Sequence, residues 1–201
     1  IPDDFKYLAI AESALENVTS PAGAKGFWQF MKKTGLAYDL EINDLVDERY
    51  HLEKSTESAC KYLSKLYEQF GNWTLAAAAY NMGPSALSKQ IKKQNVNNYY
   101  DLKLNNETSR YIFRIIAYKI IDKNPLTYGF DLDENSLYKP IKTYEMEINK
   151  TIENIANFGN EIGFNYKIIK YFNPWILKNK LEVDEKNYII KLPLEKSLEI
   201  K

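Results

Sequence analysis

A lone carboxylate within an apolar helix face is the first feature of this chain that could carry out chemistry. The apolar spacing, at about 100° per residue, predicts a helix over residues 3–16. Its buried stripe is expected to contain Phe5, Leu8, Ala9, Glu12 and Leu15. A buried acid costs free energy unless it is protonated or paired, and desolvation raises its pKa toward the range that a general acid needs. The pattern therefore predicts a general acid at Glu12, with a structural carboxylate at a helix end as the alternative.

The residues after this helix add polar groups beside aromatic rings. Residues 20–25 form a loop of small residues in which Gly23 allows a tight backbone approach. Gln29 stands between Trp28 and Phe30, and a short helix is predicted over residues 28–33. A carboxylate, a glycine-containing loop and an amide thus follow one another closely in the sequence.

Helices with almost no strand are predicted for residues 1 to about 123, and these helices must position the polar groups. Capping residues, glycine stops and proline stops set their bounds. The expected helices are 55–70 ended by Gly71, 73–82 capped by Asn72, one starting at Pro84, and 107–122 capped by Asn106 and terminated by Pro125. The packed side of the last helix is expected to contain Tyr111, Ile112, Ile115, Ile116 and Lys119.

The pattern changes after Pro125, where two strand-like segments flank two short helices. The expected order is a strand over 142–148, helices over 151–159 and 165–172, and a strand over 187–192. The small core of this segment is expected to contain Tyr144, Met146, Ile148, Ile152, Ile155, Ile168, Phe172, Ile190 and Leu192. Such a core, in fewer than about 80 residues without disulfides, is marginal alone. We therefore expect this segment to dock on the first half, with few linker residues between them.

Composition argues against several classes of protein. The chain has 27 Lys and Arg residues against 27 Asp and Glu, and nucleic-acid binders normally carry a basic excess or patch. No apolar run approaches the roughly 20 residues that span a bilayer. Because the sequence starts at Ile1 rather than Met, we expect an export signal or lipid anchor to have been removed, and a membrane tether outside this sequence stays open.

Metal and histidine chemistry are also disfavoured. With one cysteine and one histidine, the chain lacks the paired spacing of a transition-metal site, so we predict no metal and no cofactor. A Ser-His-Asp mechanism would rest on His51, which lies in the charged stretch 47–51 and is expected at the surface. Glycosidases usually pair two carboxylates. The candidates for a second carboxylate beside Glu12 lie in polar stretches with no sign of burial, and they are Asp39, Asp44, Asp47 and Glu48.

Four motifs, in order, resemble those of the lytic transglycosylase family of peptidoglycan-cleaving enzymes. They are Glu12-Ser13 with residues 20–24 and 26–31; residues 46–49 with Ser55-Thr56; Ala79-Tyr80-Asn81-Met82-Gly83; and Glu107-Thr108 with Tyr111-Ile112. Together they cover residues 1 to about 123. Tyr128-Gly129-Phe130 and Leu192-Pro193 resemble the membrane-bound type D group of this family. The strand–helix–helix–strand segment is similar to a LysM peptidoglycan-binding module.

This resemblance implies an α+β fold that is mainly α. A lysozyme-like helical catalytic domain would cover residues 1–127, and a small LysM-like or degenerate accessory domain would cover 128–201. The implied reaction cleaves the β-1,4 bond between N-acetylmuramic acid and N-acetylglucosamine without water and leaves 1,6-anhydromuramoyl ends. Glu12 would act as acid and then as base, while the C6 hydroxyl of the substrate is the nucleophile. The implied partners are peptidoglycan glycan strands, and the implied location is the periplasm or cell envelope.

The resemblance also implies substrate-binding roles for residues of the motifs. Ser20 and Gln29 would hydrogen-bond the N-acetyl group and the sugar hydroxyls. Tyr80 would orient the sugar, and Asn81 would support the groove wall. Tyr111 would place its hydroxyl near the reacting sugar.

The remaining motif residues have less defined roles. Met31 would line the groove or pack, and Glu107 would shape the groove or contact substrate from the first turn of its helix. Ser13 is expected to support local structure. Asp39 stands where glycine is common in this family, and Met82 stands where a smaller residue is usual. These departures affect groove width rather than the catalytic group.

Two other functions stay open. A hydrolytic goose-type lysozyme on the same fold would need Asp39, Asp44 or Asp47 close to Glu12, so that a second carboxylate activates water. A catalytically silent peptidoglycan-binding protein would keep the groove without the reaction, although the intact motif residues argue against it.

Overall fold

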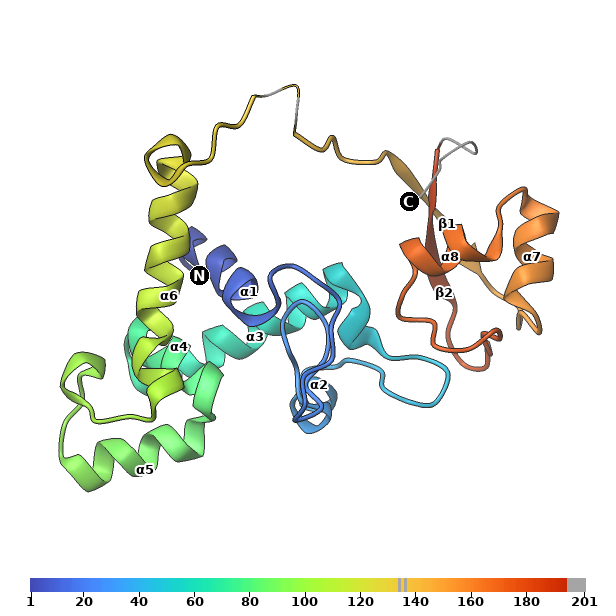
Figure 1. Cartoon of the computed structure of the whole chain (residues 1–201). Helices are drawn as coiled ribbons and strands as arrows, with labels where there is room; N and C mark the ends of the chain where they lie inside the picture. The colour runs from blue at the N-terminus through green and yellow to red at the C-terminus, as the bar shows by residue number, and fades with distance from the viewer. Residues whose placement is uncertain (134, 136, 195–201) are drawn as a thin grey trace.

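The computed structural model describes residues 1–133, 135 and 137–194, and it consists of a helical half followed by a small unit with two strands (Figure 1). The helices are α1 (Lys6–Ser13), α2 (Lys32–Ala37), α3 (Leu52–Phe70), α4 (Trp73–Met82), α5 (Pro84–Gln94), α6 (Asn106–Lys123), α7 (Ile155–Ile162) and α8 (Tyr166–Phe172). Short 3-10 helices within the described residues include η1 (Asp3–Phe5), η2 (Glu48–Tyr50), η3 (Tyr99–Asp101) and η4 (Pro125–Tyr128). The strands of the described residues are β1 (Thr143–Ile148) and β2 (Tyr188–Pro193). The predicted fold class, α+β and mainly α, is confirmed.

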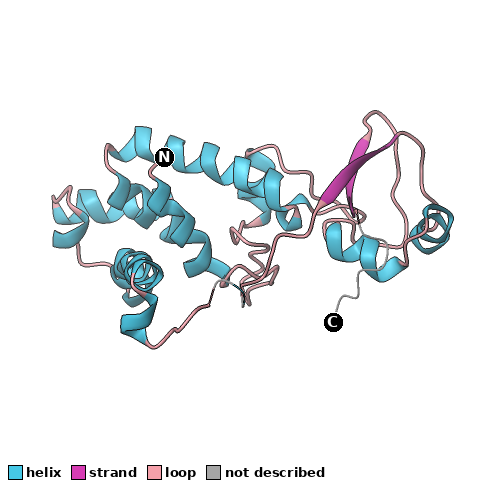
Figure 2. Cartoon of the chain, turned by 90° about the horizontal axis from the view of Figure 1, so that it is seen from above, coloured by secondary structure: helices cyan, strands magenta, loops and turns pink. Residues whose placement is uncertain are grey.

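Helix α4 organises the helical half by packing against α3, α5 and α6. Its buried alanines, Ala76 to Ala79, are small enough for neighbouring helices to approach closely. Helix α6 also packs against α1, so it returns the chain to its own beginning. Seen from above, these helices form one body, and the two strands lie at the other end of the molecule (Figure 2).

The first predicted helix is shorter than expected at both ends. Residues 3–5 form η1, and α1 ends at Ser13 because Ala14 and Leu15 adopt positive φ angles of 54° and 61°. The Ala14 N–H closes the helix by donating to the Ile10 carbonyl at 2.9 Å. Leu15 is 54% exposed, so its expected place on the buried stripe is wrong. Glu12 consequently lies in the last turn of α1.

Two other predicted bounds are corrected. The residues around Trp28 form a turn between the paired residues Lys25 and Phe30, and the helix predicted there begins later, as α2. Helix α6 is capped by Asn105 rather than Asn106, because the Asn105 carboxamide oxygen accepts from the Thr108 N–H at 2.7 Å. Ile116 is exposed and lies off the packed side of α6.

The second half has the predicted strand–helix–helix–strand order. Strands β1 and β2 pair antiparallel, from Thr143 opposite Pro193 to Ile148 opposite Tyr188. Helix α7 begins later than predicted because Ile152 pairs with Leu181. The predicted core residues belong to one buried cluster or pack against it. Within the second half, prediction missed six buried members of this cluster, which are Phe164, Ile169, Trp175, Ile176, Leu181 and Tyr188. The last part of the predicted 128–201 domain, residues 195–201, lies outside the described residues.

The second half docks on the segment that precedes α3, as expected. Val46 belongs to the buried cluster of the second half and pairs with Ile176. The Leu177 N–H donates to the Leu45 carbonyl at 2.7 Å. The connection is longer than expected, because the described residues from Gly129 to Lys142 are all exposed and form the extended link in Figure 1.

Residues of the 47–51 stretch are more buried than the sequence suggested. The His51 side chain is 15% exposed, and its ring stacks on Trp175 with 5.7 Å between centroids. Glu48 is also buried. Their environment comes from the docked second half and from folding of the loop, which local charge patterning does not reveal.

Within the described residues, neither helix length nor side-chain clustering indicates a membrane span or a metal site. No helix in that part of the chain is long and apolar enough to cross a bilayer. Across the same residues, no group of three or more His, Cys, Asp and Glu side chains is arranged to hold a metal ion.

Candidate active site

The carboxyl group of Glu12 lies where α1 packs against α6. Tyr111, a buried residue of α6, donates a hydrogen bond from its hydroxyl to Glu12 Oε1. Ser13, the next residue, supports the local structure as expected, with its hydroxyl donating to the Phe27 carbonyl at 2.9 Å. The predicted general acid therefore receives a hydroxyl donor from a residue 99 positions away in the sequence.

The surroundings of Glu12 favour its protonated form. Burial raises the pKa of Glu12 above its ordinary value, and the negative charge of Glu107 raises it further. The Tyr111 hydrogen bond and the positive charge of Arg114 lower the pKa without outweighing burial. Burial also holds the pKa of Tyr111 well above 10.0, so its hydroxyl stays a donor. A carboxyl group with a raised pKa is suited to give up a proton near neutral pH.

Arg114 takes part in this arrangement, although sequence reasoning missed it. Its Nη2 donates to the Ala11 carbonyl at 3.0 Å, in the last turn of α1, where carbonyl groups lack helical partners. Arg114 follows Tyr111 by three residues on α6, and residues at this spacing are neighbours on a helix surface. That spacing from a motif tyrosine is the signal that could have identified it.

Tyr80, near the end of α4, connects the loop that contains Trp28 to the helical core. Its hydroxyl donates to the Trp28 carbonyl at 2.7 Å. Its ring lies 5.2 Å from that of Tyr62 and 6.3 Å from that of Phe30, between centroids. Burial raises the pKa of Tyr80 well above 10.0, and the charge of Glu12 adds to this effect. Tyr80 is therefore within electrostatic reach of the candidate acid.

Gln29 and Ser20 use part of their hydrogen-bonding capacity to shape their own loop. Gln29 has a φ of 48°, and its amide nitrogen donates to the carbonyls of Val18 at 3.1 Å and Gly26 at 2.8 Å. The Ser20 hydroxyl oxygen accepts from the Ala24 N–H at 3.0 Å. What these side chains can still offer a ligand is the Gln29 amide oxygen and the Ser20 hydroxyl proton. Their sugar-binding roles stay predictions.

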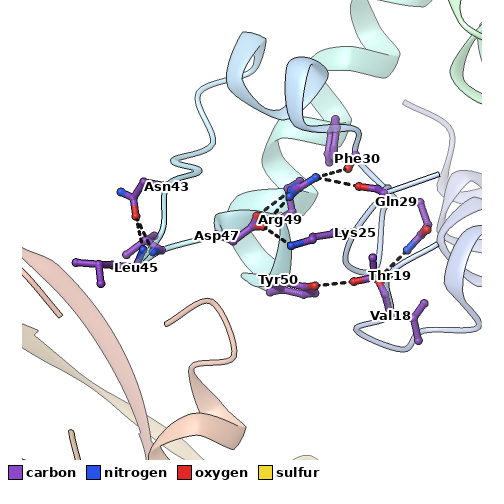
Figure 3. Close-up of polar contacts among 12 residues, drawn as sticks. Val18, Thr19, Lys25, Gln29, Phe30, Asn43, Leu45, Asp47, Arg49 and Tyr50 are labelled. Carbon is purple, nitrogen blue, oxygen red and sulfur yellow. Dashed lines mark hydrogen bonds and ion pairs between the residues drawn. The ribbon is translucent and has the colours of Figure 1, made fainter. Parts of the chain in front are cut away.

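A buried ion pair fixes this loop from its other side (Figure 3). Asp47 is 1% exposed, and its carboxylate accepts from Arg49 Nε at 2.8 Å and Nη2 at 2.7 Å. Arg49 Nη1 also donates to the carbonyls of Gly23 at 3.3 Å and Phe30 at 3.2 Å. Burial would raise the pKa of Asp47, but Arg49 and Lys25 outweigh it and hold the pKa below 3.8. The expectation that Asp47 is unburied is therefore wrong.

Asn81 and Glu107 connect the ends of α4 and α6. Asn81 Nδ2 donates to Glu107 Oε1 at 2.8 Å, and its carbonyl oxygen accepts from the Thr108 hydroxyl at 2.7 Å. Glu107 lies in the first turn of α6, as predicted. Met31 immediately precedes α2 and is 47% exposed, so it lies at the surface and not in the core.

The aspartates considered for a hydrolytic reaction are paired or exposed. Asp47 is held by Arg49, as described above. Asp39 is exposed and lies 3.4 Å from Lys61 Nζ, and its φ of 68° is the left-handed conformation that glycine adopts most easily. Asp44 is also exposed. None of these three acids is among the groups that shift the pKa of Glu12.

Comparison with known families assigns both halves of the chain. Residues 2–103 match the transglycosylase SLT domain. The chain belongs to the SLT transglycosylase family. Residues 144–196 match the soluble lytic transglycosylase C-terminal LysM-like domain, which confirms the predicted resemblance of that segment.

Two curated relatives of this SLT-family chain are long proteins. The chain is 28% identical over 196 residues to the membrane-bound lytic murein transglycosylase D of Escherichia coli strain K12. It has the same identity to the protein of that name in Escherichia coli O6:H1 strain CFT073. Each match covers 94% of this chain and 43% of the relative. The chain therefore spans less than half the length of these curated relatives.

The site extends beyond the matched SLT segment. The predicted site residues within the match are Glu12, Ser20, Gln29, Met31, Tyr80 and Asn81. Glu107 and Tyr111 follow residue 103, yet the Tyr111 hydroxyl bonds Glu12. Helix α6 is thus part of the same helical unit. The predicted domain boundary after residue 127 stays a prediction.

Proposed function

We propose that this chain is a lytic transglycosylase that cleaves the β-1,4 bond between N-acetylmuramic acid and N-acetylglucosamine in peptidoglycan. The observation that carries the proposal is the environment of Glu12, a carboxyl group with a raised pKa beside the Tyr111 hydroxyl. Membership of the SLT family supports the choice of substrate. The pairing of Asp47 with Arg49 favours a reaction with one acid over one that needs a second carboxylate.

In this proposal one carboxyl group donates a proton in the first step and accepts a different proton in the second. Glu12 first donates its proton to the glycosidic oxygen, and the bond from that oxygen to C1 of the muramoyl residue breaks. The C6 hydroxyl oxygen of the same residue then bonds to C1, and its proton passes to the Glu12 carboxylate. The products are a free hydroxyl on the leaving sugar and a 1,6-anhydro ring, so no water is consumed. The Tyr111 hydroxyl stabilises the carboxylate form that exists between the two steps.

The other motif residues are proposed to bind the strand around this centre. The Gln29 amide oxygen and the Ser20 hydroxyl would bind the acetamido group and the sugar hydroxyls. Tyr80 would orient the reacting sugar through the loop that its hydroxyl holds at Trp28. Asn81 would keep Glu107 against the groove wall.

Peptidoglycan strands are the proposed partner, and the cell envelope is the proposed location. The LysM-like segment supports this partner because its family is defined in soluble lytic transglycosylases. The membrane-bound relatives support an envelope location. The predicted absence of a cofactor fits the mechanism, because each proton in it is held by Glu12 or by the substrate.

The products of purified peptidoglycan distinguish the proposal from its alternatives. Anhydro products lack a reducing end and resist borohydride, whereas hydrolysis gives reducible ends and incorporates oxygen from labelled water. We expect mass spectrometry to show products that borohydride has not reduced and that carry no oxygen from labelled water. Reducible, labelled products would assign the chain to the lysozyme alternative, and binding without any cleavage would assign it to the silent binding alternative.

A further inference from the structure

A small pocket lies at the start of α6, the helix whose Tyr111 donates a hydrogen bond to Glu12. Its volume is about 320 Å³, and it is lined by Asn106, Glu107, Arg110 and Arg114. Glu107 raises the pKa of Glu12 and Arg114 lowers it. Two walls of the pocket are therefore within electrostatic reach of the reacting carboxyl group.

The pocket carries an uncompensated positive charge. Of its four lining residues, two are arginines and one is acidic, and that acid, Glu107, accepts a hydrogen bond from Asn81. Arg110 makes no ion pair within the described part of the chain. Arg114 gives one hydrogen bond to Ala11, out of the five N–H donors of a guanidinium group.

The spacing of the two arginines suits a single anionic group. Arg110 and Arg114 are four residues apart on α6, and side chains at this spacing are neighbours on one helix face. A guanidinium group presents a planar fork of donors that matches a carboxylate. The pocket volume is at the lower end of small-molecule sites, which span roughly 300–1,000 Å³, so it fits a branch of the substrate better than a further stretch of glycan.

We propose that this pocket binds a carboxylate on the lactyl branch of muramic acid, with Arg110 and Arg114 as its donors. The proposal rests on the function proposed above and makes it more specific. On a strand without peptides the carboxylate is that of the lactyl group itself. On a strand with peptides the lactyl carboxyl is an amide, and the carboxylate belongs to the peptide. The pocket would select muramic acid over N-acetylglucosamine, which lacks this branch.

Binding measurements with the full chain can test this selection. The background is the Glu12→Gln protein, which keeps the strand uncleaved while calorimetry measures affinity. The variant is Arg110→Gln, which removes the charge and keeps a polar side chain. The control is Lys123→Gln, the same loss of charge on α6, about 20 Å farther along at 1.5 Å per residue. The ligands are peptide-bearing strands, peptide-free strands and oligomers of N-acetylglucosamine.

We expect Arg110→Gln to weaken binding of at least one muramic-acid ligand by about tenfold, on the scale of one charge-assisted hydrogen bond. Binding of the N-acetylglucosamine oligomers should not change, and Lys123→Gln should bind all three ligands like the parent. If Arg110→Gln loses affinity for peptide-bearing strands alone, the pocket binds the peptide carboxylate. If it loses affinity for peptide-free strands, the pocket binds the lactyl carboxylate.

Two results would overturn the pocket while leaving the proposed function intact. One is an equal loss of affinity for all three ligands in Arg110→Gln, which would indicate a general structural role for Arg110. The other is unchanged binding of every ligand by Arg110→Gln. A parent protein that binds none of the three ligands would defeat the proposed function together with the pocket.

Discussion

Glu12 and Asp47 are carboxylates removed from solvent to different degrees, yet their pKa values shift in opposite directions. Burial raises the pKa of Glu12, and the single hydroxyl of Tyr111 does not offset it. Asp47 is only 1% exposed, whereas Glu12 is half-buried, but the Arg49 guanidinium and the charge of Lys25 hold the pKa of Asp47 low. Burial alone therefore does not identify a catalytic acid. The distinction lies in how many charged donors the fold gives to each carboxylate.

The largest expected effect is on activity and comes from Glu12→Gln. This change removes the transferable proton and keeps the shape, so activity should fall by at least ~10²-fold, the scale of general acid–base catalysis. The matched control is Glu16→Gln, which alters an exposed acid of the following loop. Release of soluble fragments from purified peptidoglycan measures both. Near-normal cleavage by Glu12→Gln would end the proposed mechanism.

The same variant should not lose stability at neutral pH. A raised native pKa means that the contribution of Glu12 to stability is complete below its unfolded value, near 4.5. That contribution is lost as the pH rises through the native pKa. Glu12→Gln should therefore unfold in urea at the same concentration as the parent, or a slightly higher one, at pH 7. A clear loss of stability would indicate that Glu12 is a structural carboxylate.

The opposite result is expected for Asp47→Asn. This change leaves the Arg49 guanidinium buried without its counter-charge, and breaking a buried pair costs about 3–5 kcal/mol of unfolding free energy. Because the native pKa of Asp47 is lowered, its stabilisation is present above 3.8 and is lost as the pH falls through the native value. The difference in unfolding free energy between variant and parent, measured in urea, should therefore be large at pH 7 and smaller in acid. A difference that does not change with pH would contradict the assigned ion pair.

Much of the structure around Glu12 was predictable from the sequence, but the burial and pairing that set the charge states of Glu12 and Asp47 were not. The apolar spacing pointed to Glu12 and the order of the motifs pointed to Tyr111, and the structure joins these two residues by a hydrogen bond. The end of α1 was missed because the left-handed Ala14 depends on how the next loop folds. The burial of Asp47 was missed because Arg49 is fixed by carbonyls of a distant loop. Local patterns report composition and periodicity, whereas these features come from contacts between segments far apart in the chain.

The second half shows the same division between local pattern and long-range contact. Its strands and helices follow alternation and capping, so their order was predicted. Trp175 was missed because the connection between α8 and β2 has no periodic pattern. Its partner His51 was misplaced for the related reason that its burial depends on docking of the second half.

The smallest expected effect comes from Tyr111→Phe, which tests whether one hydroxyl tunes Glu12. The hydrogen bond favours the carboxylate form, so its removal should raise the pKa of Glu12 further. Since the first step needs the protonated acid, the alkaline limb of the pH–activity profile should move to higher pH. The activity maximum should fall by about tenfold, as expected for one charge-assisted hydrogen bond. The control is Tyr99→Phe, which removes a hydroxyl bonded to the Thr108 carbonyl at 2.7 Å and should leave the limb in place. If both variants shift the limb equally, the pKa of Glu12 is set by general packing and not by its tyrosine donor.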